Sequence, residues 1–96
     1  SMIEYYGEHK GSRGNPYYRI NEMNDTHYLL RLDLDNPDSK KYTIMKQSDD
    51  FEELYKEGRK LEDKIGQKYR ELDLHHGPGG KILIEKLKAA GVFDKS

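Results

Sequence analysis

The chain has 96 residues, of which 33% are hydrophobic and 36% charged, and its formal net charge is −1. A single domain of this size buries only a modest core, which eight tyrosines can enlarge with large, half-buried side chains. The absence of cysteine excludes a disulfide framework and a cysteine zinc site, and the near-neutral charge argues against nucleic acid or an acidic membrane as the main partner. No apolar run approaches the roughly 18 residues of a membrane span and no secretory leader is evident, so we expect an intracellular protein, cytoplasmic or nuclear.

The first sixteen residues are predicted to form a flexible arm or an edge strand, ahead of one small α+β domain in residues 17–96. Ser1-Met2 is interpreted as a cloning remnant. Three glycines and a proline interrupt this segment, which is typical of a loop. An edge strand at its start is favoured by Ile3, Tyr5 and Tyr6.

Three antiparallel strands are predicted next, in residues 17–23, 27–34 and 40–46. Asn24-Asp25 suits a two-residue hairpin turn, because both residue types tolerate a positive φ. The second strand has the clearest alternation, which sends one set of side chains into the core and leaves the other mostly facing solvent. The predicted inward set is Tyr28, Leu30, Leu32 and Leu34, joined by Tyr42 and Ile44 of the third strand. The predicted outward set is His27, Leu29, Arg31 and Asp33.

A long amphipathic helix is predicted over residues 48–74, where apolar residues recur at steps of three and four. Its start is marked by capping residues and by acids in the first turn, near the positive end of the helix dipole. Gly58 lies on the apolar face, where it lets another element come close, whereas Gly66 lies off that face and is a candidate break. The predicted apolar face consists of Phe51, Leu54, Tyr55, Gly58, Leu61, Ile65, Tyr69 and Leu72.

A glycine-rich loop separates this helix from a short helix predicted over residues 81–90. Gly91 is predicted to cap the short helix, with Val92 and Phe93 folding back as its hydrophobic contact. Together these elements predict an α+β fold, with a three- to four-stranded antiparallel meander packed on one long helix, plus a short C-terminal helix.

The passage from the strand THYLLRLDL through KKYTIMK to QSDDFEELYKEG resembles the sheet-to-helix passage of phox-homology domains, whose signature is an Arg-Arg-Tyr-Ser-Asp-Phe run. Asp50 and Phe51 match that run. The resemblance implies a phosphoinositide-binding fold, but Gln47 and Ser48 stand where the family's Arg and Tyr hold the lipid, and the family's proline-rich loop is absent. The sequence therefore does not predict membership.

No motif predicts catalysis. The loop GPGGK before the last helix departs from the P-loop spacing, and Ile82 stands where a Ser or Thr would hold magnesium. His75-His76 suggests metal or nuclease chemistry, but a site there needs further ligands from elsewhere in the chain. The aspartates around residues 33–38 lack the glycine and distal glutamate of a calcium loop. We therefore predict a non-enzymatic protein with no catalytic residue, no metal site and no cofactor.

The predicted function is protein interaction, as an adaptor, inhibitor or accessory module. Tyrosine doublets in a strand expose at least one ring, and exposed tyrosine beside arginine is typical of protein-binding surfaces. The predicted contact surface is Tyr17, Tyr18, Arg19 and Leu29, and self-association as a homodimer through it is equally compatible. The alternative is binding of an anion or of nucleic-acid phosphate, a less favoured partner, through Lys10, Arg13, Gly79, Gly80 and Lys81.

Overall fold

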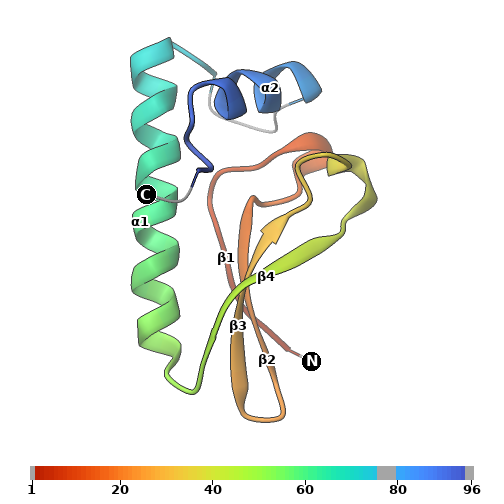
Figure 1. The fold of residues 1–96 in the computed structure, drawn as a ribbon, viewed down its shortest axis with the longest axis vertical. Helices are drawn as coiled ribbons and strands as arrows, with labels where there is room; N and C mark the ends of the chain where they lie inside the picture. Colours follow the sequence, from red (N-terminus) through yellow and green to blue (C-terminus); the bar gives the residue numbers. More distant parts are fainter. Residues whose placement is uncertain (1, 76–79, 95–96) are drawn as a thin grey trace.

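The computed structural model describes residues 2–75 and 80–94. Four antiparallel strands form one sheet in the order β1-β2-β3-β4. A long helix, α1, runs along one side of this sheet and a short helix, α2, crosses one end (Figure 1). The elements are β1 (Met2–Tyr6), β2 (Tyr18–Met23), β3 (Thr26–Leu32), β4 (Tyr42–Ser48), α1 (Phe51–Leu72) and α2 (Lys81–Ala89), with short 3₁₀ turns η1 (Ser12–Gly14) and η2 (Pro37–Ser39). The predicted α+β fold is confirmed.

The turn between β2 and β3 follows from its two residues. Asn24 and Asp25 have φ values of 52° and 67°, and Met23 pairs with Thr26 across them. Two successive positive φ values give the turn that matches the twist of a hairpin, and Asn and Asp tolerate them best after glycine. The predicted hairpin turn is therefore present.

Both edge strands of the sheet are interrupted by a bulge. The register of β1 against β2 shifts between Ile3 and Tyr5, and the pairing of β3 with β4 shifts opposite Met45. A bulge twists an edge strand and disrupts its regular hydrogen-bonding pattern, which discourages the addition of a further strand.

Helix α1 begins at Phe51, and of the three candidate caps in the sequence, Ser48, Asp49 and Asp50, it is Asp50 that caps it. The Asp50 carboxylate accepts a hydrogen bond of 3.0 Å from the backbone N–H of Glu52. The helix then continues through Gly66 to Leu72, so the predicted break is wrong. Gly66 is buried instead, and an added Cβ there would lie 3.4 Å from Nε2 of His9.

The face of the sheet that packs on α1 is the opposite of the predicted one. Leu29 pairs with Ile20 of β2, and both side chains are buried on the α1 side, where Cδ1 of Leu29 would lie 3.6 Å from a Cβ at Gly58. Tyr28 and Leu30 point to the other face, where Ile44 is 62% exposed. Leu32 is buried as predicted, but by the β1–β2 loop, since its side chain would contact a Cβ at Gly11.

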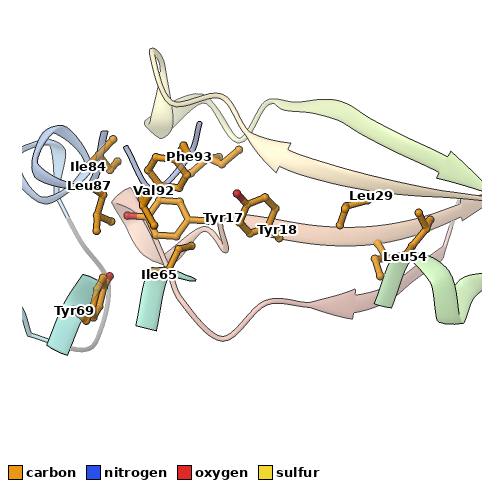
Figure 2. Packing of buried hydrophobic residues seen from close by; sticks show 12 residues of the cluster. Tyr17, Tyr18, Leu29, Leu54, Ile65, Tyr69, Ile84, Leu87, Val92 and Phe93 are labelled. Carbon is orange, nitrogen blue, oxygen red and sulfur yellow. The ribbon is translucent and has the colours of Figure 1, made fainter. Parts of the chain in front are cut away.

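The core extends from the first turn of α1 to the C-terminal segment. At one end Leu54 packs on the sheet beside Leu29, and at the other Tyr17 lies among Ile65, Val92 and Phe93 (Figure 2). Gly91 has a φ of 77°, as its predicted capping role requires, and Val92 and Phe93 then fold back. Their contact is with the main core as well as with α2, because the rings of Phe93 and Tyr17 lie 5.3 Å apart. Within residues 2–75 and 80–94, no helix has both the length and the hydrophobicity needed to cross a bilayer.

Replacing Gly58 with alanine should raise the free energy of unfolding by about 1 kcal/mol, because it removes the helix-propensity cost of an internal glycine. The added methyl group would meet Leu29 and Tyr5 at 3.6 Å, an ordinary van der Waals distance. Urea unfolding followed by circular dichroism measures the change. A loss of stability would show that α1 and the sheet have no room for a methyl group at this crossing.

Candidate functional site

The side of the sheet turned away from α1 carries an exposed aromatic and apolar surface. Strand pairing aligns Tyr6 with Arg19, Arg19 with Leu30, and Leu30 with Ile44. Figure 1 shows both helices on other sides of the sheet. We define the outer face as Tyr6, Arg19, Tyr28, Leu30, Tyr42 and Ile44. Tyr6 is 55% exposed and Ile44 62% exposed, while the others are half-buried.

Arg19 lies at the centre of the outer face between two tyrosine rings. Its guanidinium carbon is 4.5 Å from the ring centroid of Tyr42 and 5.6 Å from that of Tyr6. The Tyr42 ring is itself fixed, because its hydroxyl donates a hydrogen bond of 2.7 Å to the carbonyl of Pro16. Stacking of this kind holds an arginine flat and pre-organised while its hydrogen-bond donors stay available.

The outer face has one sign of charge. Arg19 is the charged member of the six residues, and Nζ of the neighbouring Lys10 is 5.9 Å from the Tyr6 ring centroid. The Nε atom of Arg19 is buried without a hydrogen-bond partner among the described residues. The centre of the face is therefore positive.

The predicted contact surface is wrong in three of its four residues. Tyr17, Tyr18 and Leu29 are 0%, 1% and 1% exposed, respectively. Tyr18 and Leu29 belong to the face that packs on α1, and Tyr17 lies at a bend that turns its ring towards Phe93. Only Arg19 belongs to the outer face. The alternating pattern of β3 correctly predicts which residues share a face. Because both faces carry leucine, the pattern does not predict which face α1 covers.

A second candidate site, which sequence reasoning missed, is a buried carboxylate on α1. Glu62 is 0% exposed, and its Oε2 accepts a hydrogen bond of 3.2 Å from the backbone N–H of His9. Nε2 of His9 lies 3.8 Å from the same oxygen, whereas Oε1 is buried without a hydrogen-bond partner among the described residues. One sequence signal pointed here: Glu62 lies one turn after Gly58 and one turn before Gly66, in line with both glycines.

Burial, together with the nearby charge of Glu8, raises the pKa of Glu62 from its ordinary 4.5 to about 7. The His9 backbone N–H, Arg59 and Lys10 act in the opposite direction. Burial also raises the pKa of Tyr18 to about 12, so this hydroxyl stays neutral at physiological pH. Glu62 is thus a buried acid that titrates near neutrality.

Two cations of the anion-binding alternative, Arg13 and Lys81, lie near an acid, Asp38. Arg13, in the left-handed conformation with a φ of 60°, makes an ion pair of 3.8 Å with Asp38. A hydrogen bond from the Ser12 hydroxyl lowers the pKa of Asp38, and the charges of Arg13 and Lys81 lower it further. Lys10 donates to the carbonyl of Gly7 instead. Asp38 competes with a phosphate for Arg13 and Lys81, and the alternative stays a prediction.

The other residues of this alternative are incompletely placed. Gly80 is the N-cap of α2, while Gly79 lies outside the described residues. His75 is exposed, and its neighbour His76 also lies outside the described residues. In the described part of the chain, no three His, Asp or Glu side chains come together as metal ligands would.

A shallow pocket of about 220 Å³ opens between α1 and β4. Its floor is apolar, with Tyr18 and Leu29 among its lining residues. Its rim carries two lysines and two acids, namely Lys46, Lys64, Glu57 and Asp94. These opposite charges select no class of ligand, so the outer face is the better-defined binding surface.

Comparison with known proteins places the chain in no family. No family model, no curated protein and no solved structure matches it, and the resemblance to phox-homology domains gains no support.

Proposed function

We propose that the chain is a non-enzymatic protein-interaction domain that binds a foreign protein through its outer face. The observation that carries this proposal is the exposed cluster of tyrosine, leucine and isoleucine around a stacked arginine. Tyrosine and arginine are enriched among the residues that dominate binding energy, because they bury a large area at a low entropic cost.

Charge complementarity indicates the chemistry of the partner. An apolar contact around Arg19 removes water from its guanidinium, and a carboxylate then replaces that water with charge-assisted hydrogen bonds. A second copy of this chain brings an outer face that holds an arginine and no acid. The partner is therefore a different protein, which presents an Asp or Glu side chain within an apolar surface.

The sheet edges support a face-on contact over strand addition. Both β1 and β4 carry a bulge, which interrupts the regular ladder that an added strand needs. The outer face is independent of that ladder.

The test uses two matched variants, Ile44→Asp on the outer face and Ile82→Asp on α2. Both isoleucines are highly exposed, at 62% and 77%, so neither substitution opens the core. Proteins that the tagged wild-type chain captures from an extract of its source cells are identified, purified and measured by calorimetry. We expect Ile44→Asp and Arg19→Glu to weaken the purified pair at least tenfold, as loss of a contact worth about 1.4 kcal/mol does.

The control variant Ile82→Asp should bind as the wild type does. The proposal is wrong if Ile44→Asp binds with unchanged affinity, or if both variants weaken binding equally. It is also wrong if light scattering shows a homodimer that Ile44→Asp dissociates, because the outer face then binds a second copy.

A further inference from the structure

The β1–β2 loop, residues 7–16, is folded against α1 and does not project into solvent. His9, Ser12 and Asn15 are buried or nearly so, at 8%, 8% and 9% exposure. The loop is closed by backbone hydrogen bonds from the N–H of Gly11 to Asn15 at 2.6 Å and from that of Tyr17 to His9 at 3.1 Å. Its contact with α1 is centred on Glu62.

The docking of this loop around Glu62 leaves no spare space. A Cβ at Gly7 would lie 1.7 Å from Oε1 of Glu62, and a Cβ at Gly66 would lie 3.4 Å from the His9 ring. The His9 ring also packs edge-on against Tyr69, with centroids 5.1 Å apart. An ionised Glu62 receives one backbone hydrogen bond here, from His9, and exposure to water would solvate it far better.

The charged and titratable groups around Glu62 come from three elements. The loop contributes Glu8, whose Oε1 is 3.6 Å from Nε2 of His9, and the cation Lys10. The same helix contributes Arg59, which is exposed enough for water to screen it. Glu62 also raises the pKa of four phenols that the sheet, the segment before β2 and the helix place near it. These are Tyr5, Tyr17, Tyr18 and Tyr69. These phenols are neutral at physiological pH, and Glu8 opposes ionisation.

We propose that Glu62 is a proton-controlled latch for the β1–β2 loop. The loop stays docked while Glu62 holds its proton, and it opens when that proton passes to solvent and leaves a buried carboxylate. A protonated Glu62 avoids an unpaired negative charge in the core.

Opening of the loop changes contacts that the loop makes with two tyrosines of the outer face. The carbonyl of Pro16 holds the Tyr42 hydroxyl, and Lys10 lies over the Tyr6 ring. The latch itself does not depend on the proposed function. If the outer face binds a protein, the latch makes that binding sensitive to pH near neutrality.

The sign of the effect follows from linkage. The docked state binds the proton more tightly than the open state, so docking is fully favoured at low pH and weakens as the pH rises from 4.5 to about 7. Between pH 6 and pH 8 the population of the open loop should rise about tenfold. The hydrogen exchange of the His9, Gly11 and Tyr17 amides, corrected for the intrinsic effect of pH, measures this population.

Two matched substitutions on α1 isolate the cause. Glu62→Gln keeps the shape but cannot ionise, so its loop amides should show the same corrected protection at pH 6 and pH 8. Glu53→Gln changes an exposed glutamate of the same helix and should behave as the wild type does. Equal protection at both pH values in the wild type, or a tenfold change that persists in Glu62→Gln, would overturn the latch.

A measurement on the unchanged chain covers the case in which Glu62→Gln fails to fold. The ¹³C resonance of the Glu62 carboxyl group reports its ionisation directly. We expect its titration to coincide with the loss of loop protection near neutral pH. Ionisation near pH 4.5 with the loop still docked would refute the proposal.

Discussion

Replacing Gly7 with alanine will destabilise the protein by ~3 kcal/mol, at the upper end of what overpacking of a core costs. The new Cβ would lie 1.7 Å from Oε1 of Glu62 and 3.1 Å from the Tyr18 carbonyl oxygen. Real Cβ atoms essentially never approach another atom as closely as this contact with Glu62, and the Glu62 side chain cannot swing away because it is completely buried. Urea unfolding at pH 6, where the latch is closed, measures the loss.

The partner in this clash is identified by a double-mutant cycle. Glu62→Ala removes the carboxylate and leaves the backbone N–H of His9 without its acceptor, so it is destabilising by itself. Gly7→Ala should cost much less in the Glu62→Ala background than in the wild type, because the methyl group then occupies vacated space. Equal costs in the two backgrounds would show that the conformation of Gly7, and not its contact with Glu62, requires glycine.

The two glycines of α1 show where sequence reasoning succeeds and where it stops. Gly58 on the apolar stripe correctly predicted a close approach, which Leu29 and Tyr5 make. Gly66 suggests a break because it lies just off the apolar face of α1. The β1–β2 loop packs at this point, however, so the buried face of the helix is wider here than its apolar residues indicate. His9, which fills the space at Gly66, belongs to a segment whose glycines and charges are typical of a solvated arm. Only the fold brings this segment onto the helix.

The strand faces were misassigned for a related reason. Strand β3 has leucines at both even and odd positions, so both of its faces are apolar. The alternation therefore does not predict which face packs on α1. Burial of Leu29 and exposure of Ile44 depend on the path of the chain after β4, which a periodic pattern does not encode. Arg19 lies on the outer face, but its flanking tyrosines there, Tyr6 and Tyr42, come from strands distant in sequence.

Replacing Phe93 with alanine will destabilise the protein by about 3 kcal/mol, the lower end of the range for truncating a buried aromatic side chain. The Phe93 side chain belongs to the short segment after α2, yet it is 8% exposed and packs against Tyr17. Its carbonyl oxygen accepts a hydrogen bond of 3.0 Å from Arg31, which alanine retains, so the loss measures the ring alone. For a chain of this length the melting temperature should fall by roughly 15 °C.

Ile82→Ala is the matched control, because Ile82 is 77% exposed on the neighbouring helix and its truncation should change stability by less than about 0.5 kcal/mol. Calorimetry of both variants compares a core contact with a surface one on the same part of the chain. Nearly equal melting temperatures for Phe93→Ala and the wild type would mean that the C-terminal segment does not close the core over Tyr17. In that case Tyr17 would be exposed in solution, and the contact surface predicted from the tyrosine doublet would regain one of its residues.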